Sequence, residues 1–262
     1  MTDFKSEKSK QESYSWRRSI EFTHYNNVLG WYQVEACLEH ARGNSVLDLA
    51  CGDGTLTAKL ANYFERVVGV DASSAHLSEA RKLVPTAVFI ESLIEDLEVN
   101  EYFDTVTMFN ILEHVRDPIA VLLKASSFLK PDGMLIVQVP NALAINRRIA
   151  VIMGSLKSCE ELSPYDIEIL GHRRSYTMDK LKQDIKKAGL NLFSTGGVFF
   201  KMFSTPQMDW FLKNGLWDEG GFGWGRVGSE KKDWRKEFCR ACYEIGKEYP
   251  EECNIIYACA TK

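Results

Sequence analysis

Short apolar runs alternate with amphipathic segments through the first half of this chain. The runs are rich in Val, Leu and Ile and end at turn residues, which is typical of buried strands; they cover residues 45–50, 66–71, 87–90, 105–109 and 134–139. The segments between them have the apolar spacing of helices, over residues 55–64, 73–83 and 117–129. Alternating strands and helices indicate parallel strands joined by helical crossovers. The pattern therefore predicts an α/β fold with a doubly wound, mostly parallel sheet.

The pattern is less regular outside this region. Residues 1–13 are polar and charged and predict a disordered tail, whereas helical spacing over 14–43 predicts an N-terminal helical cap. After Pro140 the spacing predicts helices over 144–153, 178–188 and 231–247 and strands over 190–193, 198–203 and 254–260.

We expect one domain over residues 14–262, with a ligand-binding core at 44–140. The segments 141–176 and 204–230 interrupt the regular pattern and are expected to be insertions that cover the core as lids and contact substrate.

Composition excludes several classes of protein. The chain has 262 residues, 45% of them hydrophobic and 26% charged, which is ordinary for a globular protein. A net charge of −4 argues against nucleic acid as the main partner, because such binding depends on clustered Lys and Arg. Without the apolar segment of a secretory signal or a membrane span, we expect a cytoplasmic protein whose seven cysteines are reduced.

A glycine turn carries the first candidate chemistry, in the stretch 48–54 (Asp-Leu-Ala-Cys-Gly-Asp-Gly). It follows a predicted strand, and ligands of open α/β sheets bind at the carboxyl ends of the strands. Asp71 ends the next predicted strand, where a carboxylate can accept both hydroxyls of a ribose. Thr57 stands where a dinucleotide motif requires its third glycine, and Asp48 and Asp53 would repel a pyrophosphate. The expected ligand is therefore a cation that carries a ribose.

These motifs, together with the stretch 110–115 (Asn-Ile-Leu-Glu-His-Val), resemble the class I S-adenosylmethionine-dependent methyltransferases. The broad group that includes the ubiquinone-pathway O-methyltransferases is the most similar, over residues 40–140. The resemblance implies a Rossmann-like sheet of seven strands with the last one antiparallel, and S-adenosylmethionine as the cofactor.

The resemblance also implies the positions that contact this cofactor. Asp48, Gly52 and Gly54 border its methionine end, Asp71 holds the ribose, and residues 91–94 pack beside the adenine. The full expected set is Tyr25, Asp48, Ala50, Gly52, Asp53, Gly54, Asp71, Ala72, Ser92, Leu93, Ile94, Asn110 and Ile111. Many relatives have an acidic residue at the position of Leu93, so the adenine contact here falls to a neighbouring side chain or to the main chain.

His114 is the candidate catalytic base, because an imidazole has its pKa near neutral pH. A structural histidine at a helix start is the alternative interpretation. Two further residues have competing interpretations: Cys51 as a small buried side chain rather than a nucleophile, and Asp53 as a helix cap or a ligand contact.

A second cluster, Gly171-His-Arg-Arg-Ser-Tyr176, precedes a predicted helix. Arginine binds carboxylates and phosphates through two parallel hydrogen bonds, which suggests an acidic or phosphate-bearing acceptor. The candidate acceptor-binding residues are Arg147, Arg148, His172, Arg173, Arg174 and Tyr176. The alternative is that these arginines pair with acidic side chains at 160, 161 or 166.

The expected reaction is transfer of a methyl group to an oxygen, or less favourably a nitrogen, of a small molecule, a sugar or a peptide terminus. A nicotinamide-dependent oxidoreductase and a non-catalytic S-adenosylmethionine-binding module are the alternatives. No metal site is expected, because the spacing of Cys239, Cys242, Cys253 and Cys259 matches no common zinc module.

Overall fold

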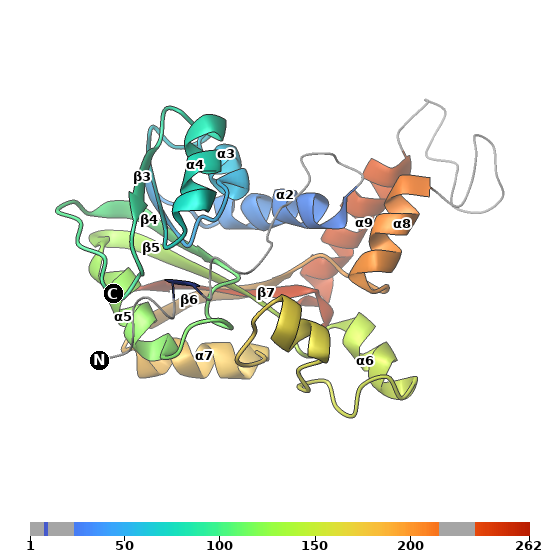
Figure 1. The fold of residues 1–262 in the computed structure, drawn as a ribbon. Coiled ribbons are helices and arrows are strands. Elements are labelled where there is room, and N and C mark those ends of the chain that lie inside the picture. Colours follow the sequence, from blue (N-terminus) through green and yellow to red (C-terminus); the bar gives the residue numbers. More distant parts are fainter. Residues whose placement is uncertain (1–7, 10–23, 215–233) are drawn as a thin grey trace.

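A seven-stranded sheet organises the protein, for which a computed structural model describes residues 8–9, 24–214 and 234–262 (Figure 1). The strands are β1 (Ser45–Leu49), β2 (Arg66–Asp71), β3 (Val88–Glu91), β4 (Phe103–Phe109), β5 (Leu129–Pro140), β6 (Asn191–Val198) and β7 (Ile255–Thr261). Their order in the sheet is β3-β2-β1-β4-β5-β7-β6, and β7 runs antiparallel to both of its neighbours. The predicted doubly wound sheet with an antiparallel last strand is confirmed.

Helices cover both faces of this sheet. They are α2 (Tyr25–Leu38), α3 (Thr55–Leu60), α4 (Ser74–Leu83), α5 (Pro118–Ser127), α6 (Ile145–Ile152), the π-helix η1 (Tyr165–Ile169), α7 (Met178–Lys187), α8 (Thr205–Asn214), α9 (Trp234–Glu248) and the 3₁₀ turn η2 (Pro250–Glu252). Ser73, Asp117 and Thr177 begin α4, α5 and α7 with side-chain oxygens that accept backbone N–H groups of the first turn. No helix within the described ranges has the length and apolar character needed to cross a bilayer.

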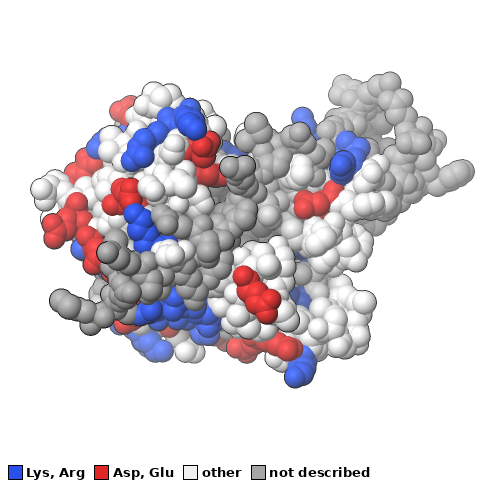
Figure 2. Space-filling view, viewed as in Figure 1, with Lys and Arg blue, Asp and Glu red and all other residues white. Residues whose placement is uncertain are grey.

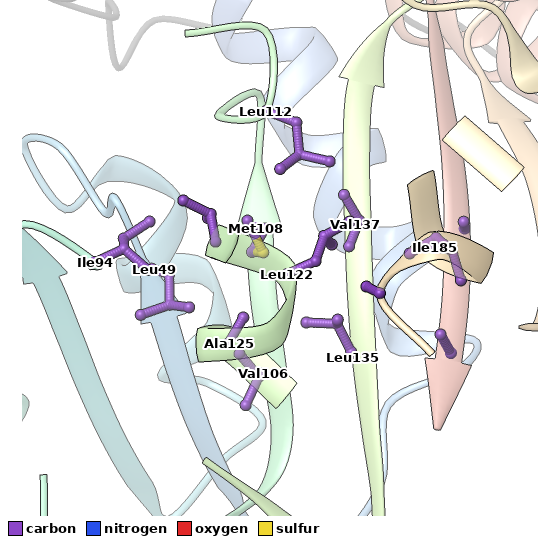
Figure 3. Packing of buried hydrophobic residues seen from close by; sticks show 14 of the residues in the cluster. Leu49, Ile94, Val106, Met108, Leu112, Leu122, Ala125, Leu135, Val137 and Ile185 are labelled. Atoms are coloured by element: carbon purple, nitrogen blue, oxygen red, sulfur yellow. The ribbon is translucent and has the colours of Figure 1, made fainter. Parts of the chain in front are cut away.

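Two apolar clusters hold the helices on the sheet. One lies between the sheet and helices α5 and α7, where Leu122, Ala125 and Ile185 pack against Met108 and Val137 (Figure 3). The other joins the opposite face to residues of α2, α3, α8 and α9. All five residues of β1 are buried, which explains why this strand reads as a continuous apolar run. The site described below lies at the carboxyl end of this strand.

The structure differs from the predicted elements after β5. Residues 198–203 were expected to form a strand of their own, but β6 is one strand that ends at Val198. Phe199 has a left-handed backbone (φ 69°), which a continuing strand cannot accommodate. The first part of the expected insertion 204–230 is the helix α8. The rest of that insertion and the expected tail, apart from residues 8–9, lie outside the described residues.

Candidate active site

The glycine turn after β1 is fixed by the acid at the end of β2. Gly52 and Gly54 both have a left-handed backbone, with φ of 55° and 80°. One carboxylate oxygen of Asp71 accepts the Gly52 N–H at 2.9 Å, and the other accepts the Ser73 N–H at 2.9 Å. Asp71 therefore orients the turn that follows β1 as well as facing the cavity beside it.

Asp48 is buried beneath this turn. Its carboxylate accepts hydrogen bonds from the hydroxyls of Thr57, at 2.6 Å, and Thr107, at 2.9 Å. The hydroxyl that Thr57 supplies would be lost with a glycine. The departure of Thr57 from the dinucleotide motif thus has a structural reason.

Asp53 and Cys51 complete the turn. Asp53 accepts the backbone N–H and the hydroxyl of Thr55, the first residue of α3, and it also lines the cavity, whereas the N-cap position itself is Gly54. Burial raises the pKa of the Cys51 thiol well above its usual value, so the side chain stays protonated. This environment agrees with the interpretation of Cys51 as a small buried side chain.

The turn borders a cavity of about 130 Å³. Its walls are formed by Asp48, Ala50, Cys51, Gly52, Asp53, Thr55, Leu56, Asp71, His76, Phe109, Asn110, Ile111 and His114. Three of these described lining residues are carboxylates and none is Lys or Arg, so the cavity favours a cation. His76 was not predicted as a site residue; its Nδ1 lies 3.5 Å from a carboxylate oxygen of Asp71. Its position in the first turn of α4, the helix that follows Asp71, was the signal that could have identified it.

Several expected cofactor positions do not line this cavity. A Cβ at Gly54 would face α4 rather than the cavity, and Ala72 is also absent from the walls. The Ser92 N–H donates to the Asp71 carbonyl, and the Ser92 hydroxyl donates to the Leu93 carbonyl. Ile94 packs in the apolar core (Figure 3). The structure therefore leaves the expected adenine contacts of 91–94 as a prediction.

Two residues at the ends of adjacent strands have left-handed backbones. They are Ala50 after β1 (φ 58°) and Asn110 after β4 (φ 55°), and neither is glycine. Such conformations cost free energy and concentrate at functional sites. The side-chain oxygen of Asn110 accepts a hydrogen bond from Gln33 Nε2 at 3.3 Å, which connects the turn after β4 to α2.

A second cavity of about 500 Å³ adjoins the first, and Asn110 lines both. Its walls come from α2, the α6–η1 segment, the start of α8 and the chain around Asn254. The expected helical cap and the insertion 141–176 therefore both contribute to it. Tyr25, expected at the cofactor, lines this second cavity instead, and its hydroxyl lies 3.1 Å from the Asn254 side-chain oxygen.

A model of the methyltransferase domain matches residues 28–195, which is more than half of the chain. The chain belongs to the methyltransferase domain family. The predicted membership of the S-adenosylmethionine-dependent methyltransferases, and with it the enzyme class, is confirmed.

Two curated relatives illustrate the similarity. The ubiquinone biosynthesis O-methyltransferase of Haemophilus ducreyi is 30% identical over 161 residues, which cover 56% of this chain and 68% of the relative. The enzyme with this name from Actinobacillus pleuropneumoniae serotype 7 is 33% identical over 123 residues, or 43% of this chain and 52% of the relative. The chain thus matches between about half and two thirds of the length of these relatives.

Solved structures share the fold. A Thermotoga maritima S-adenosylmethionine-dependent methyltransferase, described as a possible histamine N-methyltransferase, has a TM-score of 0.59 at 20% identity, over 92% of this chain and 90% of that one. The plantazolicin methyltransferase BamL, solved with S-adenosylhomocysteine, has a TM-score of 0.54 at 18% identity, and the match covers 100% of this chain and 90% of that one.

The predicted base of this methyltransferase, His114, lies in a buried cluster. Burial, followed by the charge of His172, lowers the pKa of His114 to about 3, so its ring is neutral at pH 7. Its Nε2 lies 3.6 Å from Glu113, and burial raises the pKa of that carboxyl to about 8. The His114 and His172 rings meet edge to face at 4.9 Å. The possible ligand atoms of Glu113, His114 and His172 all lie within 4.8 Å of one another, so these three described residues could hold a metal ion.

This cluster was not predicted, because His172 joins Glu113 and His114 from a segment distant in the sequence. Its backbone N–H donates to the Asp166 carbonyl, and the next residue, Arg173, donates its N–H to the Glu113 carbonyl. The stretch 171–176 therefore braces the turn after β4.

The candidate arginines of the methyltransferase contact protein groups. Arg174 donates to the carbonyl oxygens of residues 112, 115 and 116, and Arg148 pairs with Glu252 at 2.9 Å. Arg147 lines the second cavity and lies 3.3 Å from Asp166, one of the acids weighed as its partner. Tyr176 is fully buried and donates to Asp184, away from both cavities. Of the expected acceptor residues, Arg147 and His172 line the second cavity.

Lys201 is the functional candidate that sequence reasoning missed. It lines the second cavity and is only 6% exposed. Its Nζ donates to the Thr205 hydroxyl at 2.9 Å and lies 4.7 Å from the centre of the Tyr25 ring. Burial lowers the pKa of this amine to about 7. The sequence signal that could have identified it is a single lysine within the otherwise apolar stretch 198–203.

Proposed function

We propose that this methyltransferase transfers the methyl group of S-adenosylmethionine to a hydroxyl oxygen of a small molecule. The observation that carries the proposal is the pair of adjoining cavities that share Asn110. The acidic cavity suits a cationic sulfonium that carries a ribose, and the larger one has room for an acceptor. The relatives named O-methyltransferases support oxygen as the target.

The turn residues fit this cofactor. A Cβ at Gly52 would have no neighbour within 4 Å, so the backbone there faces open space into which ligand atoms can come close. Asp48, Asp53 and Asp71 line the same space, and their charge would oppose the pyrophosphate of a nicotinamide dinucleotide. On the face seen in Figure 2, basic and acidic side chains are interspersed, which supports a small acceptor rather than a nucleic acid.

The chain's own residues contribute position rather than covalent chemistry. Bound S-adenosylmethionine supplies an electrophilic methyl group on a leaving group that departs uncharged. Asp71 would hold the ribose while Gly52 and Asn110 set where the sulfonium lies. Walls from α2, α6 and η1 surround the space for the acceptor. They would position its oxygen in line with the methyl group and displace water from around it.

Calorimetric titration tests the cofactor site. Asp71→Asn keeps the shape of the side chain but removes its charge, and loss of hydrogen bonds to a charged group should weaken S-adenosylmethionine binding about 10- to 100-fold. Glu101→Gln removes an exposed carboxylate that pairs with Arg66, and should leave binding unchanged. Equal affinity of Asp71→Asn and parent, or tight binding of NADH by the parent, would contradict the proposal.

A further inference from the structure

Lys201 lies where the acceptor would bind, on the wall of the larger cavity. Its two contacts are the hydroxyl of Thr205 and the face of Tyr25, and neither carries a charge. Among the described residues, no carboxylate oxygen lies within the 4 Å of an ion pair with its Nζ. An ammonium ion that is buried without a carboxylate partner is destabilised relative to the neutral amine.

The charged groups that surround Lys201 act on the pKa of its amine in both directions. Asp209 on α8 and Asp166 on η1 favour the ammonium form, and Arg147 on α6 opposes it. Asp166 lies 3.3 Å from Arg147, while Asp209 accepts the Tyr25 N–H at 2.5 Å. Both acids thus already have partners, and desolvation dominates at the amine.

We infer that Lys201 is the catalytic base that takes the acceptor's hydroxyl proton during methyl transfer. The inference deepens the proposed function and rests on it. As the acceptor oxygen bonds to the methyl carbon, the carbon–sulfur bond breaks and its electron pair stays on sulfur. The O–H proton passes to Nζ, so the products are a methyl ether, S-adenosylhomocysteine and an ammonium group. Solvent then takes that proton.

The base role fits Lys201 better than His114, the base expected from the sequence. A general base is most effective when its pKa lies near the working pH. Burial brings the pKa of Lys201 to about 7, whereas that of His114 falls to about 3. An imidazole with so low a pKa is a weak base and contributes little to the removal of a hydroxyl proton.

The test measures methyl transfer from S-adenosylmethionine to a panel of phenols that includes catechol. Lys201→Met should lower kcat about 100-fold, as expected for the loss of a general base. The parent rate should rise with pH through about 7 as the amine loses its proton, and this rise should be absent in the variant. Lys201→Arg keeps a positive charge but not a base, and should be as slow as Lys201→Met.

Lys59→Met is the matched control. Lys59 is also a buried lysine on an aromatic face, 4.7 Å from the centre of the Trp31 ring, but it lies outside both cavities. This variant should stay within about twofold of the parent, whereas general-base loss costs at least about 100-fold. Methylamine or ethylamine added to Lys201→Ala should restore part of the rate.

The outcomes separate the two proposals. Parent-like rates in Lys201→Met or in Lys201→Arg would overturn the base role and leave the methyltransferase intact. Binding of S-adenosylmethionine without turnover of any phenol by the parent would overturn a phenolic hydroxyl as the target, and with it the role of Lys201 as the base for such acceptors. Failure to bind S-adenosylmethionine would remove the cofactor assignment itself.

Discussion

Alanine at Gly52 and at Gly54 should separate the stability of the fold from binding of the cofactor. Both glycines have positive φ, so an L side chain costs about 1–2 kcal/mol at either position. The two positions differ in what the added Cβ would meet. At Gly54 it would lie 2.8 Å from the Ala80 Cβ and 2.9 Å from the Ala80 Cα, whereas at Gly52 it would meet nothing within 4 Å.

The expected magnitudes follow from these contacts. The Ala80 backbone belongs to α4 and cannot move freely, so overpacking adds about 1–3 kcal/mol to the backbone strain of Gly54→Ala. The free energy of unfolding should therefore fall by about 2–5 kcal/mol for Gly54→Ala and by about 1–2 kcal/mol for Gly52→Ala. Gly52→Ala should instead weaken S-adenosylhomocysteine binding by at least about tenfold, because its methyl group occupies the cofactor's space.

Urea unfolding and calorimetric titration measure the two effects. Gly189→Ala is the control for backbone strain, because Gly189 has φ of 70°, meets nothing within 4 Å and lies outside both cavities. It should lose as much stability as Gly52→Ala and keep full cofactor affinity. The reasoning is wrong if Gly54→Ala is no less stable than Gly52→Ala, or if Gly52→Ala binds the cofactor like Gly189→Ala.

The buried Glu113 and the partly exposed Asp104 give predictions of opposite sign. Burial raises the pKa of Glu113 from 4.5 to about 8, so the folded protein retains a proton there and loses stability as pH rises through this window. Glu113→Gln should not show this loss of stability. Urea unfolding at pH 5 and pH 8 measures it, and the prediction is wrong if the free energy of unfolding falls by the same amount in parent and variant. At Asp104 burial is outweighed by hydrogen bonds from Ser45 and Lys130, which lower the pKa from 3.8 to about 2. Its stabilisation should be present above pH 4 and disappear towards pH 2, and acid unfolding of Asp104→Asn should lack this component.

The sequence predicts those features that depend on neighbours along the chain. Apolar runs identify the strands, because a strand buried on both faces has few polar positions. The glycine turn and Asp71 are equally local, since the turn directly follows β1 and Asp71 is the last residue of β2. The end of β6 at Val198, just before Phe199, was not predicted. A left-handed backbone at an aromatic residue such as Phe199 has no sequence signal and depends on packing against Tyr25 and Tyr32.

Charge at the acceptor cavity shows where sequence reasoning stops. Four arginines in two short stretches suggested an acidic acceptor, but the structure places carbonyl oxygens around Arg174 and carboxylates beside Arg147 and Arg148. Lys201 gave no such signal, because one lysine among apolar residues is ordinary in a sequence. What distinguishes it is burial beside uncharged groups contributed by α2 and α8. The chemical state of an ionisable residue depends on which other charges reach it, and that is decided by contacts between segments far apart along the chain.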